Sequence, residues 1–355
     1  MNVTKKLLSF WIVISLLFSN CQAGAKLLKD ELIKPLNVIL LIGDGMGLAQ
    51  ICAASVINGG LTLEIFENIG FIKTSSSDDY ITDSAAGATA FSTGEKTYNG
   101  AIGLAKDSSS RKTIVEMAET KGLATGLIST CSVTHATPAS FFAHQLNREM
   151  HLEIANDFYG KGIDFVAGTG KPYFNLEKLI LDGYKITTST SKPTLNALEK
   201  NFWFYNDSVS PPKVKERGNW LAQATEEGMR CLSNNKKGFF LMVEGSQIDW
   251  GGHDQDIDYV TSELIDFDQA VLKAYEYAKT HPNTLIIVTA DHETGGLTLN
   301  GGSLKNKSVK TNFAHGHHSG IMVPVFAFGP GSHLFRGTYE NTEIFRKIKN
   351  LMGLQ

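Results

Sequence analysis

Short apolar runs recur along the chain, each bounded by glycine or polar residues. They are rich in leucine and β-branched residues, and they are too short to form core helices. Strands buried on both faces of a parallel sheet have this continuous apolar pattern. The runs therefore predict strands at Asn37–Ile42, Leu123–Ser129, Phe239–Val243, Thr284–Thr289 and Val325–Phe328.

Segments with helical patterns lie between these runs. One spans Thr113–Lys121 and ends at Gly122, and longer patterns predict helices at Ile257–Thr280 and Glu343–Met352. Strands that alternate with helices predict an α/β fold, in which a mostly parallel central sheet is flanked by helices on both faces.

Two polar segments interrupt this alternation. Gly183–Arg217 contains three prolines, and Gly301–Asn312 is rich in lysine, serine and asparagine. We expect both to be irregular surface loops. Because no repeat and no linker-like stretch divides the chain, we expect a single domain over residues 26–355.

The N-terminus has the pattern of an export signal over residues 1–25. Lys5 and Lys6 precede the apolar run Leu7–Phe18, which suits a signal peptide better than a membrane span. Ala23-Gly24-Ala25 offers a cleavage site, whereas Cys21 resembles the lipidated cysteine of a bacterial lipoprotein. The third reading is a structural N-terminal helix. Export predicts a periplasmic protein, a surface or outer-membrane lipoprotein held only through Cys21, or a secreted protein.

Composition narrows the classes of partner. The chain has 355 residues, a formal net charge of −3 and 42% hydrophobic residues. This balance argues against a nucleic-acid-binding surface. The cysteine spacing shows no zinc pattern and no disulfide framework, so we expect Cys52, Cys131 and Cys231 to be small apolar residues in the core.

Polar residues follow several of the predicted strands. Asp44 comes after the first, Glu244 and Asp249 come after the third, and Asp291-His292 follow the fourth. Each of these residues, taken alone, is also typical of a turn or a helix cap. Ligands of parallel α/β sheets bind beyond the carboxyl ends of the strands, so together these residues predict a site at that edge.

The spacing of these residues suits metal ligands. Asp249 and His253 are four apart, which places them on one side of a helical turn, although an ion pair has the same spacing. His315, His317 and His318 form a second cluster, and the spacing does not decide which of them binds. A donor set of oxygen and nitrogen without thiolates suits Zn²⁺ together with Mg²⁺.

Ser84 is the candidate nucleophile. It follows Asp83 and opens a run of small residues that predicts the first turns of a packed helix, where backbone N–H groups attract anions. No histidine lies next to it in sequence, so we expect the metals to activate it. Arg148 is a candidate for binding a phosphate through two hydrogen bonds, although a single arginine is also typical of the protein surface. A serine beside two metals is equipped for phosphoryl transfer.

The ordered motifs resemble the alkaline phosphatase family from about Val38 to Phe335. They are Asp44-Gly45-Met46-Gly47, Thr82-Asp83-Ser84-Ala85-Ala86, Ser92-Thr93-Gly94-x-Lys96-Thr97-Tyr98-Asn99-Gly100, His135-Ala136-Thr137-Pro138, Val243-Glu244-Gly245, Asp249-x-x-x-His253, Thr289-Ala290-Asp291-His292-Glu293 and His318-Ser319-Gly320. The resemblance implies an alkaline-phosphatase-like catalytic domain that hydrolyses phosphate monoesters through a phosphoserine at Ser84.

The resemblance also implies the ligand sets of two zinc ions and one magnesium ion. Asp249, His253 and His318 would bind the first zinc; Asp44, Asp291, His292 and Ser84 the second; and Asp44, Thr137 and Glu244 the magnesium. Arg148 stands at the position of the phosphate-binding arginine of the family.

The chain departs from the family pattern in two ways. His135 and Trp250 stand beside the third metal, where the enterobacterial branch has an acidic residue and a lysine, and a histidine there favours Zn²⁺ or Co²⁺. The short stretch between His292 and His318 implies that the crown subdomain is absent or vestigial. The usual dimer is therefore not assumed, and an open site predicts small phosphomonoester substrates of broad structure.

Two other functions compete with this one. A phosphodiesterase of the same superfamily would keep the zinc sites, but Thr137, Arg148 and Glu244 favour monoesters. A non-catalytic surface protein could bind phosphate in the same pocket, but it would not need the nucleophile.

Overall fold

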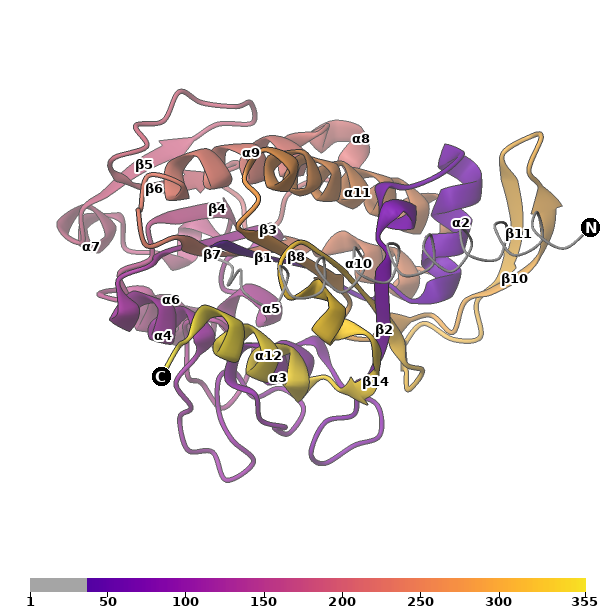
Figure 1. Ribbon diagram of the computed structural model, residues 1–355, viewed down its shortest axis with the longest axis horizontal. Helices are drawn as coiled ribbons and strands as arrows, with labels where there is room; N and C mark the ends of the chain where they lie inside the picture. The colour runs from indigo at the N-terminus through magenta and orange to yellow at the C-terminus, as the bar shows by residue number, and fades with distance from the viewer. Residues whose placement is uncertain (1–36) are drawn as a thin grey trace, which may run out of the picture.

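A ten-stranded sheet runs through the middle of the computed structural model, which describes residues 37–355 (Figure 1). The predicted signal and Cys21 lie outside these residues. The strands of the sheet are β1 (Asn37–Gly43), β2 (Asn68–Lys73), β3 (Ala124–Ser132), β4 (Phe165–Thr169), β5 (Tyr184–Thr188), β6 (Lys200–Phe204), β7 (Phe239–Gly245), β8 (Thr284–Thr289), β13 (Val323–Phe328) and β14 (Gly337–Glu340).

The sheet is mostly parallel, which confirms the predicted fold class. Its strand order is β14-β2-β13-β8-β1-β7-β3-β4-β6-β5. β13 runs antiparallel to both of its neighbours, and the other pairs are parallel. The strands β1, β7 and β8 are buried along their whole length except at Asn37, as their continuous apolar runs predict.

Helices cover both faces of the sheet (Figure 1). On one face, α11 (Ile257–Thr280) packs against α2 (Leu48–Asn58), α9 (Trp220–Leu232) and α10 (Gln247–His253). On the other face lie α3 (Ser84–Thr93), α4 (Ile114–Lys121), α5 (Ala136–Ala139), α6 (His151–Phe158) and α12 (Thr342–Met352). The shorter α7 (Leu176–Leu181) and α8 (Val214–Arg217) complete the α-helices of residues 37–355, none of which is long and apolar enough to cross a bilayer.

The two segments predicted as irregular loops contain regular structure, so that prediction was wrong. Gly183–Arg217 holds β5, β6 and α8, because Tyr184 and Phe202 are buried and pack against other aromatic rings of the core. Gly301–Asn312 lies in a hairpin of β10 (Thr298–Ser303) and β11 (Ser308–Asn312), which projects from the body of the molecule (Figure 1).

Strand register brings the polar residues to one edge of the sheet. Ile42 of β1 pairs with Glu244 of β7 on one side and with Thr289 of β8 on the other. Asp44 and Asp291 follow these strands and therefore emerge beside Glu244. The backbones meet closely here, because a Cβ at Gly45 would lie 2.8 Å from the Cα of Asp249, and Gly45 also has a positive φ of 72°.

A buried ion cluster fixes the start of α10. Arg217 pairs with Glu263 and with Asp266 of α11, and its Nη1 donates to the carbonyl of Pro212. The adjacent carbonyl of Pro211 accepts from Gln247, the first residue of α10. Because α10 carries Asp249 and His253, this cluster holds one side of the polar edge in place.

Candidate active site

Ser84 is the first residue of α3, and the small residues after it let this helix approach the polar edge. The N-cap Asp83 accepts a hydrogen bond from Ala86 N at 2.9 Å. Ser84 is buried, and its Oγ lies 3.3 Å from His292 Nε2. A Cβ at Gly87 would lie only 3.0 Å from the Cβ of Asp291. The run of alanine and glycine is therefore a condition for placing the serine against the acidic residues.

Asp249, His253 and His318 meet at one point. His253 Nε2 lies 3.2 Å from Asp249 Oδ2 and 3.2 Å from His318 Nε2, and His318 Nε2 lies 3.5 Å from Asp249 Oδ1. These are the three ligands predicted for the first zinc. His318 reaches them because β12 (His318–Ser319) pairs with β9 (Glu293–Thr294). His315 and His317 stay outside the candidate metal groups of the described residues.

Hydrogen bonds at Nδ1 turn the Nε2 atoms of these histidines inward. His253 Nδ1 donates to Gly316 O and His318 Nδ1 donates to Thr82 O, both at 2.9 Å, since a carbonyl can only accept. Burial lowers the pKa of His318, which leaves its Nε2 lone pair free. The hydrogen bond to Asp249 raises the pKa of His253 to about 9, so a proton occupies the place of a cation in the metal-free chain.

Asp44, Asp291, His292 and Ser84 form the group predicted for the second zinc. His292 Nε2 lies 3.5 Å from Asp44 Oδ1 and 3.3 Å from Asp291 Oδ2. Burial lowers the pKa of His292, and burial raises the pKa of Asp291 to about 8. The structure thus places two carboxyl groups and a hydroxyl around His292 Nε2. Asp249 also brings a ligand atom within 4.8 Å of those of Asp44 and His292.

Asp44, Thr137 and Glu244 form the group predicted for the third cation. Glu244 is wholly buried beside Asp44 and Thr137, and burial raises the pKa of Glu244 to about 7. Thr137 lies in α5, and burial and the charge of Asp291 raise the pKa of Asp44.

Several buried oxygen atoms of the three ligand groups have no hydrogen-bond partner, which shows whether these groups suit bound cations. Within residues 37–355 they include Asp44 Oδ1 and Oδ2, Thr137 Oγ1, Glu244 Oε1 and Asp291 Oδ2. Buried polar atoms are normally paired, and carboxylate and hydroxyl oxygens are ligands of Mg²⁺ and Zn²⁺. The unpaired oxygens of these groups therefore fit bound cations.

Arg148 lies in the turn before α6 and contacts Asp83, the residue before Ser84. Its Nη1 donates to Asp83 Oδ2 at 3.2 Å, and its Nη2 lies 3.5 Å from His135 Nε2. Trp250 packs edge-on against His135, with 6.1 Å between ring centroids. Asp83 thus links the guanidinium to the N-terminus of α3, and His135 and Trp250 lie on its other side.

Two residues of the site, Thr294 and Cys131, were not predicted from the sequence to belong to it. The Thr294 hydroxyl donates to Asp249 and accepts from His292 Nδ1, so it joins ligands of the first two groups and leaves His292 Nε2 free. Its position two residues after His292 on an extended segment was the available signal. Cys131 and Cys231 are buried as predicted, whereas Cys52 is exposed, so the prediction was wrong for Cys52. The Cys131 sulfur also lies 3.4 Å from Glu244 Oε2. The predicted strand ended at Ser129, whereas β3 continues to Ser132.

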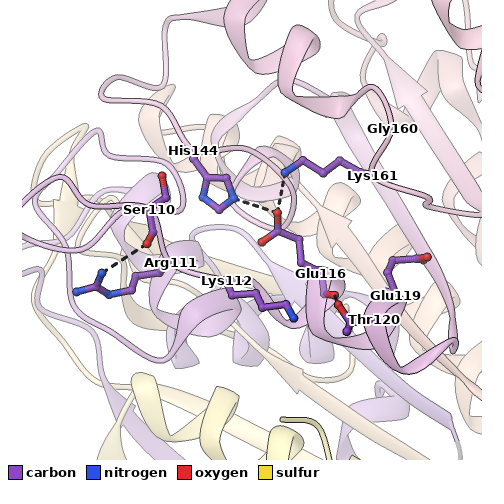
Figure 2. A pocket seen from close by; sticks show the side chains of 9 residues that line it. All are labelled: Ser110, Arg111, Lys112, Glu116, Glu119, Thr120, His144, Gly160 and Lys161. Atoms are coloured by element: carbon purple, nitrogen blue, oxygen red, sulfur yellow. Dashed lines mark hydrogen bonds and ion pairs between the residues drawn. The ribbon is translucent and has the colours of Figure 1, made fainter.

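A separate hollow of about 460 Å³ lies away from these groups (Figure 2). At its centre Glu116 Oε1 pairs with His144 Nε2 at 3.1 Å and with Lys161 Nζ at 2.6 Å. Burial works against ionisation, but these partners hold the pKa of Glu116 near 2. The Glu116 carboxylate already has hydrogen-bond and ion-pair partners. It therefore differs from the carboxyl groups of the candidate active site, which have unpaired oxygen atoms.

Comparison with known proteins points to one family. The family model described as alkaline phosphatase matches residues 35–165 and 212–312. Alkaline phosphatase 3 of Bacillus subtilis is 32% identical, over 97% of this chain and 96% of the relative.

Solved structures agree with this match. The alkaline phosphatase of the Antarctic bacterium TAB5 is 45% identical, with a TM-score of 0.85 over 91% of this chain and 99% of its own. A variant of that enzyme, with a histidine replaced by glutamate, has Mg bound in its M3 site; it is 44% identical, with a TM-score of 0.84 over the same shares of the two chains.

We expect metal-free protein to lose stability as pH rises from about 7 to about 9. Asp291 and His253 have pKa values of about 8 and about 9, above the ordinary values of 3.8 and 6.5. The folded state therefore binds more protons than the unfolded chain in this window, and each such extra proton lowers the free energy of unfolding by up to about 1.4 kcal/mol per pH unit. Urea unfolding after chelation measures the slope.

Zinc should raise the urea midpoint most at the upper end of this pH range, because it replaces the missing protons. The matched variant Asp291→Asn should have a shallower slope without metal. A midpoint of the metal-free wild type that stays constant or rises between pH 7 and 9 would contradict the electrostatic account.

Proposed function

The chain belongs to the alkaline phosphatase family and is a phosphatase, and on that premise we propose that it hydrolyses phosphate monoesters through a phosphoserine at Ser84. One observation carries the proposal: the Ser84 hydroxyl lies at a helix N-terminus, 3.3 Å from His292 Nε2, within a cluster of buried carboxyl groups. A hydroxyl nucleophile, an arginine and groups of metal ligands at one sheet edge are the parts that phosphoryl transfer uses.

The ligand groups support two zinc ions and a third cation, for which the family pattern implies Mg²⁺. Asp249, His253 and His318 would hold the first zinc; Asp44, Asp291, His292 and Ser84 the second; and Asp44, Thr137 and Glu244 the third cation. When bound, these cations lower the pKa of the attacking group and offset the charge of the transition state and the leaving oxygen.

The Ser84 hydroxyl loses its proton and its Oγ attacks phosphorus; the bond from phosphorus to the ester oxygen breaks, and that oxygen takes up a proton as the alcohol leaves. Water then loses a proton and attacks phosphorus, the bond to Ser84 Oγ breaks, Oγ regains a proton, and inorganic phosphate is released. The small residues of α3 allow the hydroxyl to approach the metal ligands, and Thr294 orients Asp249 and His292 for both steps.

Arg148 and the N-terminus of α3 would bind the non-bridging oxygens of the phosphate. Asp83 holds Nη1 of the guanidinium and also accepts from Ala86 N and Gly100 N, so one carboxylate fixes both the arginine and the helix terminus. Preorganised donors of this kind act where charge develops in the transition state. A monoester offers three such oxygens, whereas a diester offers two.

We propose small phosphomonoesters of broad structure as substrates. Between His292 and His318 the structure has only β9 and the β10–β11 hairpin, and the His253 side chain remains 39% exposed. Such a site contacts little of the substrate beyond its phosphate. Export to the periplasm, the surface or the medium, by cleavage or by a lipid at Cys21, remains our proposal from the N-terminal sequence.

Ser84→Ala should lower the turnover of p-nitrophenyl phosphate by about 10³-fold or more, because the variant lacks the hydroxyl that forms the phosphoserine. Metal content should stay close to that of the wild type. Acid quenching followed by peptide mass spectrometry should find phosphate on Ser84 of the wild type. Ser92→Ala, at the other end of α3, is the control with normal turnover. Near-normal rates in Ser84→Ala would rule out the covalent mechanism.

Arg148→Ala should lower kcat/KM for p-nitrophenyl phosphate by about 10²- to 10³-fold, the usual loss for one transition-state donor. For bis-p-nitrophenyl phosphate we expect a loss of less than about 10-fold, because the diester has fewer charged oxygens. The exposed Arg346→Ala serves as control. Equal losses on both substrates, or a wild-type enzyme that is faster on the diester, would contradict the assignment.

A further inference from the structure

A cysteine borders the group of residues that would hold the third cation. Cys131 lies at the carboxyl end of β3, next to β7, which carries Glu244. The thiol is fully buried, and its sulfur lies 3.4 Å from Glu244 Oε2 and 3.3 Å from Ser132 O. This carboxylate is a predicted ligand of the third cation, so the sulfur lies within reach of the same position.

His135 brings a nitrogen to the same place. One ligand atom from each of Cys131, His135 and Glu244 lies within 4.8 Å of the other two. His135 Nδ1 and Glu244 Oε1 are both buried and without a hydrogen-bond partner, whereas His135 Nε2 faces Arg148. The thiol is therefore accompanied by two unpaired buried atoms, which packing alone does not explain.

A second buried cysteine offers a contrast. Cys231 lies in α9 and contacts Arg230, its neighbour in sequence, at 3.8 Å. Among the described residues it belongs to no group of candidate metal ligands. Burial of a cysteine in this fold therefore does not by itself bring an imidazole and a carboxylate to its sulfur.

We propose that Cys131 supplies a thiolate ligand, together with His135 and Glu244, to the third cation site, so that this site takes Zn²⁺ or Co²⁺ in preference to Mg²⁺. The inference rests on the third site of the proposed function. Magnesium binds oxygen ligands, whereas zinc and cobalt accept sulfur and imidazole nitrogen. The thiol proton is released to solvent when the cation binds.

The direct test is X-ray absorption at the zinc edge of the wild-type protein loaded with zinc. We expect three zinc ions per chain and a sulfur shell at about 2.3 Å. In cobalt-loaded protein the same ligand should give a thiolate-to-cobalt charge-transfer band in the near ultraviolet. Absence of both signals, or a third site that prefers Mg²⁺ when the two ions compete, would overturn the proposal.

Variants identify the sulfur. Cys131→Ser should remove the sulfur shell and the charge-transfer band, and should weaken binding of the third zinc by at least about 10-fold. Cys231→Ser, the control, should keep all three signals. Signals that persist in Cys131→Ser would assign them to another cysteine and refute the proposal. These readouts do not depend on turnover. A protein that shows the sulfur signal but no phosphatase activity would therefore refute the proposed function and leave the thiolate ligand supported.

Discussion

The burial of several carboxyl groups at one place is the constraint on which the rest of the structure depends. Asp44, Glu244, Asp249 and Asp291 are buried at the same edge of the sheet. Burial, and after it the neighbouring carboxyl groups, raise the pKa of Asp44 and of Asp291. Charges buried in this way are stable only when paired or when they coordinate metals. The charge of Arg148 lowers the pKa of Asp44, but burial and three neighbouring carboxyl groups act more strongly in the opposite direction. Bound cations would supply the positive charge that Arg148 does not.

The surrounding structure serves this edge. Parallel pairing of β1 with β7 and β8 brings three carboxyl ends together, and Gly45 allows the backbones to meet. The alanine- and glycine-rich start of α3 then places a hydroxyl against the cluster. Among residues 37–355, the imidazole in contact with Ser84 belongs to His292, a predicted metal ligand. The proposed mechanism therefore assigns the activation of Ser84 to bound metals, and Ser84 needs no general base next to it in sequence.

Much of this arrangement could be predicted from the sequence, for a physical reason. Strands buried on both faces leave an unbroken apolar run, and in a parallel sheet the polar residues after such runs share one edge. β8 and α11 agree with the predicted ranges to the residue. Tertiary pairing was harder to predict: β5, β6 and the β10–β11 hairpin have polar or mixed sequences, and only their contacts with the core or with each other define them as strands.

The contacts of single side chains were also hard to predict from the sequence, because they depend on tertiary pairing. Spacing could not distinguish His318 from His315 and His317, because the choice depends on the pairing of β12 with β9, which stacks the rings of His318 and His292 at 3.6 Å. Cys131 was predicted as a core residue because the cysteine spacing shows no zinc pattern and no disulfide framework. Buried polar contacts of this kind depend on distances across the fold and leave no periodic pattern in the chain.

Anomalous diffraction from crystals of the zinc-loaded protein tests the central claim most directly. The account predicts one zinc peak enclosed by Asp249, His253 and His318, and a second enclosed by Asp44, Asp291 and His292, with Ser84 Oγ at a bonding distance of about 2.0–2.2 Å from the second. Zinc bound elsewhere, or a Ser84 Oγ out of bonding range of every cation, would contradict the account.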